Sequence, residues 1–423
     1  MNAQTRLALK VGFAAALSIL LALSFHFQDP YWTGISAFLV CVDSADNSFQ
    51  RMLQRVGCTL LGALGGLLAA HYLMDNPVLL ILVAFVVMLL CVYKGLQSHN
   101  WYVWIFSVIT FFMVIADVMT NASTQNILDV GVYRCLNIIL GSTVGFAVAW
   151  TFSSAPRKVK GPRKRCYKLK VTDHWKRFRQ NRFYAWFGVK VALAMVAFPL
   201  LWAQFNLPGA TQIAVSIGAV LNIDFIATRQ KSQMRVLGCF LGAIAAVFTL
   251  LVLRVETLSF LLVLVFAVAF ACSYFHNSSS PFAYAGTQAV VAFLMGVVVS
   301  FEPSTIPDPS IERLVDIIGG VLLLNLVLQY LWPFSPQAQL KHFHGQVEQR
   351  LADIKSIAQG CLQHPQYDLF ESAAPNLQLL KRDTAQLQKL KGTLPDTIPP
   401  LGALESALKT SPEQTLLLFK RQN

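Results

Sequence analysis

Apolar residues gather in long runs that are separated by short polar stretches. A run of roughly 20 apolar residues is long enough to cross a bilayer as a helix. Lipid offers backbone N–H and C=O groups no partner, so a segment inside it is helical. The pattern predicts an all-α polytopic membrane protein with about twelve spans, at residues 7–25, 31–42, 56–73, 78–93, 101–119, 132–152, 185–203, 211–226, 236–253, 257–275, 282–301 and 314–334.

The first part of the chain is repeated in the second. Residues 10–63 align without a gap with residues 190–243, and fourteen of these 54 pairs are identical. Roughly four or five identities are expected by chance in so apolar a sequence. Polar residues are among the identical pairs, which include Lys10/Lys190, Ser36/Ser216 and Arg55/Arg235. The chain is therefore an internal duplication with six predicted spans in each half.

The distribution of charge predicts the orientation of the spans. The 423 residues are 55% hydrophobic and 13% charged, with a net charge of +13, whereas about a quarter of the residues of a soluble domain are charged. Twelve Lys or Arg residues stand between Pro156 and Arg182, against one acidic residue. In a membrane protein such a segment indicates a cytoplasmic loop and not a nucleic-acid-binding patch. We therefore expect both termini in the cytoplasm and no nucleic acid among the partners.

These features divide the chain into four parts, which are a first six-span repeat (1–155), a basic cytoplasmic linker (156–182), a second six-span repeat (183–334) and a cytoplasmic helical tail (335–423). Six spans per repeat bring the chain back to the same side of the membrane, so the two repeats are expected to be parallel. In the tail, apolar residues recur every three or four positions, which predicts amphipathic helices.

Catalytic motifs are missing from the sequence. The tail contains no phosphate-binding loop, zinc-binding HExxH sequence or nucleophile elbow. The eight cysteines show neither paired nor CxxC spacing. We therefore expect a protein that is not an enzyme and that uses no cofactor and no metal.

The second span of each repeat is unusually short. Residues 31–42 form only twelve apolar positions before Asp43, which rise about 18 Å as a helix, against about 30 Å of hydrocarbon. The counterpart, 211–226, is interrupted by Asn222 and Asp224. Shortened segments at corresponding positions of two repeats indicate the substrate site of a transporter. We therefore place the site at these spans and expect both to contribute to one anion path.

Positive charge near these spans indicates an anionic substrate, because an organic anion in a low-dielectric cavity needs a cation and an apolar wall. The candidate substrate-binding residues are Trp32 for the wall, Ser36 and Ser216 for hydrogen bonds, and Lys10, Lys190, Arg55 and Arg235 for the charge. Lys10 also lies near the inner end of its span, where a lysine can extend to the phosphate layer. Asp43 and Asp224 are candidate proton carriers, because a carboxyl group in a dry cavity can hold a proton near neutral pH.

The sixth span of each repeat begins with a similar pattern of charge. Asp129 and Arg134 in the first half correspond to Asp308 and Arg313 in the second. An arginine about one turn inside a membrane needs a partner, so a structural ion pair is one interpretation. The functional alternative is an outer gate for anions formed by Arg134 and Arg313.

Two motifs carry a family resemblance. With DPYWTGISAFLV at residues 29–40 and RVGCTLLGALGG at residues 55–66, the chain resembles the fusaric-acid-resistance-like family of aromatic acid exporters over residues 5–335. The resemblance implies proton-driven export of aromatic or other organic acids across the inner membrane, in some members with a periplasmic adaptor protein. It places Trp32, Arg55 and Gly62 on family-like positions.

We therefore expect a secondary transporter for the proton-coupled efflux of organic acid anions through the lipid bilayer, with a periplasmic adaptor and further copies of the chain as candidate partners. One alternative is an organic-anion channel, because the layout of six spans, six spans and a helical tail also resembles the plant malate-channel family. In a channel, the same cationic groups set selectivity without coupling. The other alternative is a non-transporting membrane scaffold whose tail and linker recruit a partner or anionic lipid.

Overall fold

The structure of the chain is a computed structural model. It describes residues 2–42, 45–97, 101–120, 124–152, 182–204, 210–220, 225–255, 257–278, 280, 282–299 and 308–330, and a few positions between 344 and 352. Contacts divide the chain into two compact units, Met1–Leu331 and Trp332–Asn423. Nearly all of the basic linker and of the tail lies outside the described residues.

The predicted all-α class is confirmed, since each predicted span coincides with a helix and no strand occurs among the described residues. The helices of the first half are α1 (Ala3–Ser24), α2 (Tyr31–Cys41), α3 (Ala45–Leu73), α4 (Pro77–Gln97), α5 (Trp101–Thr120) and α6 (Thr124–Thr151). Those of the second half are α8 (Arg182–Gln204), α9 (Ala210–Val220), α10 (Phe225–Phe248), the π-helix η1 (Thr249–Leu253), α11 (Leu258–His276), α12 (Ala283–Val297) and α13 (Asp308–Tyr330).

Six described helical segments are long and apolar enough to cross a membrane, and they are Gln4–Ser24, Asn47–Leu73, Pro77–Gly95, Gly131–Thr151, Thr228–Leu253 and Leu258–His276. Shorter apolar helical stretches occur at Tyr31–Cys41, Trp101–Ala116, Ala185–Ala197, Ala283–Val297 and Leu314–Tyr330. The chain is therefore a multi-pass helical membrane protein.

Two helices begin well before their apolar runs. α3 begins at Ala45 and α10 begins at Phe225. The polar residues that precede the apolar runs 56–73 and 236–253 are therefore largely helical. Arg55 and Arg235 thereby lie within helices, and both side chains are buried. Hydropathy marks the start of a span at the last charged residue, whereas the helix continues wherever protein surrounds its polar side chains.

Glycines permit close helix contacts within each half. A Cβ atom on Gly62 of α3 would lie 2.3 Å from the carbonyl oxygen of Ser107 in α5. A Cβ atom on Gly242 of α10 would lie 2.2 Å from the carbonyl oxygen of Ala289 in α12. Only glycine permits such an approach of two backbones. The third and fifth helices of each half pack closely in this way.

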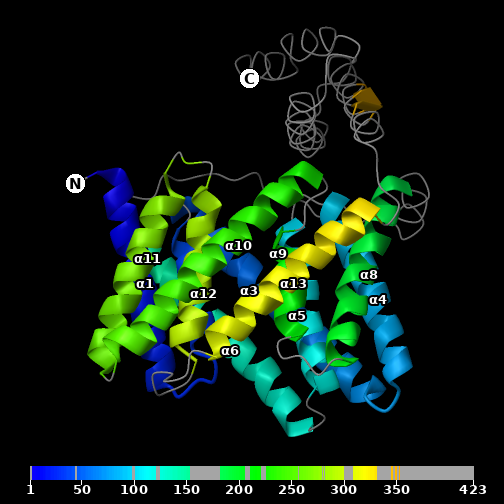
Figure 1. Cartoon of the computed structure of the whole chain (residues 1–423), viewed down its shortest axis with the longest axis horizontal. Helices are drawn as coiled ribbons and strands as arrows, with labels where there is room; N and C mark the ends of the chain where they lie inside the picture. Colours follow the sequence, from blue (N-terminus) through cyan, green and yellow to red (C-terminus); the bar gives the residue numbers. More distant parts are fainter. Residues whose placement is uncertain are drawn as a thin grey trace, which may run out of the picture. The chain divides into compact units, whose positions relative to one another are not determined.

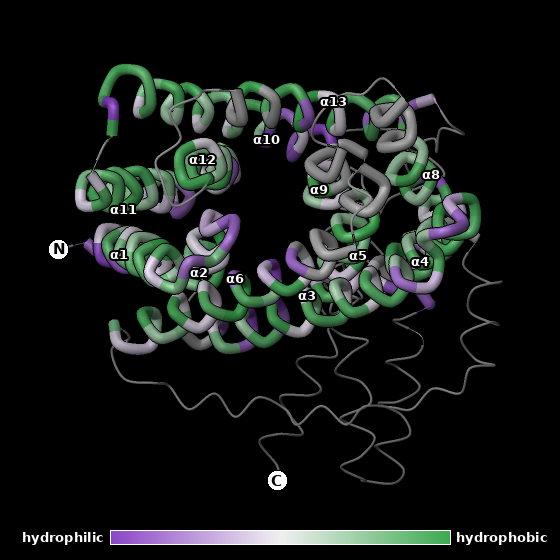
Figure 2. Tube along the Cα trace, turned by 90° about the horizontal axis from the view of Figure 1, so that it is seen from below, coloured by the Kyte–Doolittle hydropathy of each residue, from purple (hydrophilic) through white to green (hydrophobic). Residues whose placement is uncertain are grey.

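The contacts between the halves are reciprocal. Figures 1 and 2 show α1 beside α11 and α4 beside α8, so the first helix of each half packs against the fourth helix of the other. The second helix of each half likewise contacts the fifth helix of the other, since α2 packs on α12 and α9 packs on α5. Two copies of one unit around a two-fold axis produce this pattern.

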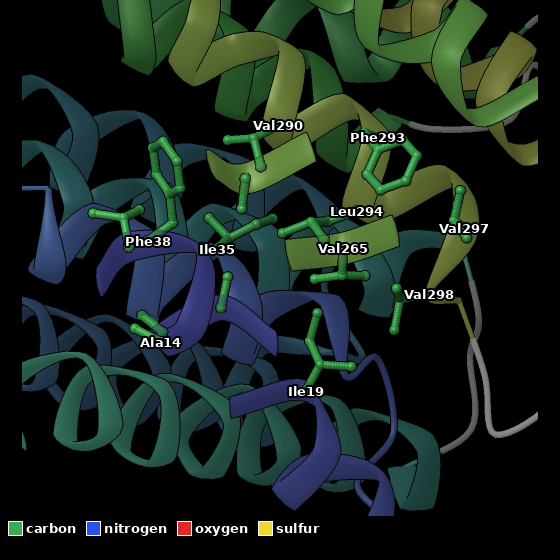
Figure 3. Close-up of a cluster of buried hydrophobic side chains, with 14 of the residues drawn as sticks. Ala14, Ile19, Ile35, Phe38, Val265, Val290, Phe293, Leu294, Val297 and Val298 are labelled. Carbon is green, nitrogen blue, oxygen red and sulfur yellow. The ribbon is translucent and has the colours of Figure 1, made fainter. Parts of the chain in front are cut away.

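A large apolar cluster joins the two halves. Figure 3 shows its side chains from α1, α2, α11 and α12, which point toward one another. Phe38 of α2 and Phe293 of α12 are fully buried in it, as are Ile19 of α1 and Val265 of α11. Within a membrane such side chains stabilise the fold by van der Waals packing and not by leaving water. The cluster therefore holds the short helix α2 in a fixed position.

Candidate functional site

The two shortened helices predicted from the sequence are the shortest α-helices described, since α2 and α9 each have eleven residues. α2 is enclosed by α1, α3, α6 and α12, whereas α9 is enclosed by α5, α8 and α13 (Figure 2). The residues of α2 from Trp32 to Phe38 are all buried. α2 therefore lies inside protein over most of its length.

The start of α2 is fixed by a turn around Asp29 and Pro30. Asp29 adopts a left-handed conformation with φ of 53°, and its carbonyl oxygen accepts a hydrogen bond of 3.1 Å from the amide of Trp32. Pro30 occupies the N-cap and Tyr31 is the first helical residue. Pro30 therefore precedes the first helical residue and does not itself occupy the first helical position. The turn directs Trp32 into the protein, where its side chain is 7% exposed.

Arg55 reaches from α3 to the middle of α2. Its Nη2 donates to the hydroxyl oxygen of Ser36 at 3.1 Å, and its Nη1 donates to the hydroxyl oxygen of Tyr102 in α5 at 2.9 Å. The Ser36 hydroxyl donates in turn to the carbonyl oxygen of Trp32 at 2.7 Å. Arg55 is only 5% exposed, and its buried Nε has no hydrogen-bond partner among the described residues.

Arg235 repeats this arrangement in the second half. Its Nη2 donates to the hydroxyl oxygen of Ser216 at 3.3 Å, and its Nη1 donates to the side-chain oxygen of Gln288 in α12. Arg235 is 3% exposed, and its buried Nε likewise has no partner within the described part of the chain. The predicted pairs Ser36/Ser216 and Arg55/Arg235 are therefore equivalent in geometry as well as in sequence.

Both guanidinium groups carry a buried charge whose hydrogen-bond partners are neutral. No carboxylate among the described residues lies within ion-pair distance of Arg55 or Arg235. A buried charge costs several kcal/mol when it is not paired with an opposite charge, and the neutral hydroxyl and amide acceptors offset only part of that cost. Each site can therefore accept an anion, and an anion would supply the opposite charge that the described protein does not.

The two sites are separate. The described partners of Arg55 all belong to the first half and those of Arg235 to the second half. α2 and α9 are not among the helix pairs that pack closely together. The structure thus describes one cationic site in each half, and a path shared by both halves stays a prediction.

The two predicted lysines lie in the first helix of each half. Lys10 in α1 is 8% exposed, and Lys190 in α8 is 1% exposed. The charge of Lys10 acts on the thiol of Cys41 at the end of α2, so Lys10 lies near the same short helix as Arg55. Both lysine residues are buried overall, and the role of Lys10 at the site stays a prediction.

Arg134 in α6 lies over the side chain of Trp32. Its Cζ is 3.2 Å from the centre of the indole ring, a cation–π contact. Its Nε and Nη1 atoms are buried and have no hydrogen-bond partner among the described residues. No ion pair joins it to Asp129, which is exposed. The ion-pair interpretation of Arg134 is therefore wrong for Asp129, and an aromatic ring holds the guanidinium instead.

Asn137, one turn after Arg134, attaches α6 to the start of α2. Its side-chain oxygen accepts a hydrogen bond from the Thr33 hydroxyl, and its Nδ2 donates to the carbonyl oxygen of Gln28 at 2.6 Å. Asn137 and Thr33 are both fully buried. These bonds fix the distance between α2 and α6, and with it the position of Trp32 beneath Arg134.

Part of the predicted site lies outside the described residues. Asp43 and Asp224 are not described, and the side chain of Arg313 is not described either, although its backbone lies in α13. The proton carriers and the second arginine of the outer gate therefore stay predictions. Among the residues that are described, no group of three or more His, Cys, Asp or Glu side chains could hold a metal ion.

Sequence reasoning missed the partners of the two buried arginines. The hydroxyl oxygen of Tyr102 accepts a hydrogen bond from Arg55, and the side-chain oxygen of Gln288 accepts one from Arg235. Asp316 in α13 is a buried carboxylic acid that aligns with Asn137 in α6. That alignment was a signal for Asp316, whereas the pairing of Tyr102 with Arg55 across 47 residues of sequence had none.

The comparisons with known proteins agree with this architecture. Residues 16–148 match a family model described as fusaric acid resistance protein-like, and residues 186–391 match one described as the fusaric acid resistance protein family. Each half thus matches a model of its own. No curated protein and no solved structure matched the chain. The resemblance seen in the sequence is confirmed, and the chain belongs to the fusaric acid resistance protein family of membrane transport proteins.

Proposed function

We propose that the protein is a secondary transporter that exports organic acid anions, including aromatic carboxylates, in exchange for protons across the inner membrane. Its membrane part consists of two parallel repeats of six spans, with both termini in the cytoplasm. The reciprocal packing of α1 on α11 and of α4 on α8 supports this layout, because a two-fold axis along the membrane normal relates parallel repeats. Membership of a family of transporters supports the reaction class.

One observation carries the proposal for the substrate. Arg55 and Arg235 are buried in an apolar helical membrane protein, and each is held by a serine of a short helix. A guanidinium and a carboxylate about 4 Å apart attract each other by roughly 4 kcal/mol at the effective dielectric constant of protein sites. That attraction is comparable with the several kcal/mol that burying the anion costs, so the anion can both bind and leave.

Proton coupling needs a carboxyl group that takes up and releases a proton as the anion moves. We propose Asp43 and Asp224 for this role, as the sequence indicates. Buried Asp316 is a further candidate, because acidic residues inside membrane helices mark ion and proton pathways. The lysines Lys10 and Lys190 would add positive charge to the path from positions near the short helices.

Flux in proteoliposomes tests the proposal. Vesicles loaded with radiolabelled benzoate are diluted into buffer of lower pH, and release is compared with release at equal pH and from protein-free vesicles. The double variant Arg55→Gln and Arg235→Gln should lower protein-dependent release at least about tenfold. Arg229→Gln is the matched control, because Arg229 lies in α10 with Arg235 but is exposed. Full release by the double variant would refute the proposed cation sites.

An organic-anion channel is the second candidate, and the neutral partners of the two arginines favour it. The hydrogen-bond partners of the two arginines are neutral side chains, and none of them is an acid that could couple anion and proton movement; they are Tyr102, Ser36, Gln288 and Ser216. A channel predicts ohmic anion currents in a planar bilayer at equal pH on both sides. A transporter predicts flux that requires the pH gradient and gives no such current.

A further inference from the structure

Two guanidinium groups contact the same short helix in the first half, the buried one of Arg55 and the partly buried one of Arg134, whose Nε and Nη1 atoms are buried. Arg134 lies over the ring of Trp32, and Arg55 is bonded to the hydroxyl of Ser36. Trp32 and Ser36 are four residues apart in α2, and the Ser36 hydroxyl donates to the carbonyl oxygen of Trp32. Four residues of an α-helix rise about 6 Å. The two guanidinium groups are therefore attached to α2 about one helical turn apart.

The charges around Arg134 do not cancel. Arg55 and Arg134 both carry a positive charge, and Asp29 is an acidic residue whose charge acts on Arg134. Asp29 is exposed, so water screens its contribution. Two like charges in protein need an anion nearby, and the unpartnered nitrogens, Nε of Arg55 and Nε and Nη1 of Arg134, are free to donate to one.

We propose that Arg55 and Arg134 form one anion site on α2, and that Trp32 is a positioning residue that holds Arg134 in it. The inference rests on the proposed transport of organic anions past Arg55. It adds Arg134 as a second residue that contacts the anion and assigns Trp32 a role through Arg134. It also determines what the site recognises in its ligand.

The site recognises the anionic group and does not recognise an aromatic ring through Trp32. The indole is 7% exposed, and the face beneath Arg134 is occupied by a guanidinium at 3.2 Å. A ligand ring that stacked on that face would first have to displace a cation. Carboxylates with and without an aromatic ring should therefore bind with similar affinity, as long as the charge and the size match.

The second half has no aromatic residue at the position that corresponds to Trp32. Gln212 occupies the position that corresponds to Trp32, as the alignment of residues 10–63 with residues 190–243 shows. A glutamine offers no aromatic face to a guanidinium. The two-arginine site therefore belongs to the first half, and the Arg235 site should bind an anion through a single guanidinium group.

Ligand-induced thermal stabilisation of the purified full chain in detergent tests the inference, with benzoate and cyclohexanecarboxylate as the probes. All variants are made in, and compared with, an Arg235→Gln parent, so that the separate Arg235 site does not bind the probes. Both acids are fully ionised at neutral pH and have rings of similar size.

Trp32→Leu and Arg134→Gln should each raise the apparent Kd of both probes by about tenfold or more. Trp32→Phe should keep the apparent Kd within about threefold, because the aromatic face remains. Trp150→Leu is the matched control, since Trp150 is an exposed tryptophan of α6.

The outcomes separate this inference from the proposed function. Loss of binding in Arg55→Gln together with parent-level binding in Arg134→Gln would overturn the two-arginine site and leave transport past Arg55 intact. Parent-level binding in Arg55→Gln would refute the proposed function itself. Benzoate binding more than about tenfold tighter than cyclohexanecarboxylate would overturn the recognition of charge alone. Equal loss in Trp32→Leu and Trp32→Phe would show that Trp32 does not act through its aromatic face.

Discussion

Gly62 offers the sharpest test of the packing that positions the site. A Cβ atom added there would lie 2.3 Å from the carbonyl oxygen of Ser107 and 2.8 Å from the Cβ of Thr110, both in α5. Ordinary contacts begin near 3.4 Å, so α3 and α5 would have to separate by about 1 Å. Gly57 lies in the same helix, and a Cβ atom there would meet nothing within 4 Å.

The expected effect follows from these distances. Overpacking against a rigid backbone costs typically about 1–3 kcal/mol, and a gap of about 1 Å forfeits up to half of each dispersion contact along the seam. We expect Gly62→Ala to lower the free energy of unfolding by about 3 kcal/mol. Gly57→Ala should leave it unchanged or raise it by up to about 1 kcal/mol, because alanine favours the helix.

Reversible unfolding in mixed micelles of a mild detergent and sodium dodecyl sulphate measures both variants, with tryptophan fluorescence as the signal. The two substitutions change the same residue type in the same helix, so effects of helix propensity are shared and the difference reports packing alone. If Gly62→Ala is as stable as Gly57→Ala, the close contact of α3 and α5 described here is wrong.

Three further predictions concern the same contacts. Gly242→Ala should destabilise the protein as much as Gly62→Ala does in the same unfolding measurement, because the added Cβ would lie 2.2 Å from the carbonyl oxygen of Ala289. An unchanged free energy of unfolding would show that the two halves are not packed alike. Asn137→Leu should cost about 2 kcal/mol of unfolding free energy, since it leaves the buried Thr33 hydroxyl without its acceptor, and an unchanged midpoint would contradict this. Tyr102→Phe removes a hydrogen-bond acceptor of Arg55 and should lower benzoate flux in proteoliposomes about threefold to tenfold, while wild-type flux would show that this bond does not position the cation.

The sequence predicted the helices well, because the apolar runs that form them depend on local composition. Apolar runs identified each helix, and the alignment of the halves identified Arg55 with Arg235 and Ser36 with Ser216 before their hydrogen bonds were known. Residues that recur at one spacing in two copies keep their relation in space. The alignment therefore carried three-dimensional information that hydropathy alone does not.

The rest of the site depends on contacts between distant helices. Nothing in the local sequence indicates that Tyr102 meets Arg55 or that the ring of Trp32 lies beneath Arg134. Hydropathy also placed the starts of α3 and α10 too late, because it cannot distinguish a charged residue in a loop from one whose charge is held inside protein. The interpretation of Arg134 and Asp129 as an ion pair was wrong for a related reason. The partner of Arg134 is the uncharged ring of Trp32, which the pattern of charged residues in the sequence cannot indicate.

The central claim is that Arg55 and Arg235 bind the transported anion. A density map of the protein with bound 4-iodobenzoate tests it most directly, because iodine locates the ligand independently of its shape. We predict ligand density with the carboxylate against the guanidinium of Arg55 beside Ser36, and a second site against Arg235 beside Ser216. Ligand density confined to the lipid-facing surface, with both guanidinium groups bonded only to their serine, tyrosine and glutamine partners, would contradict the account.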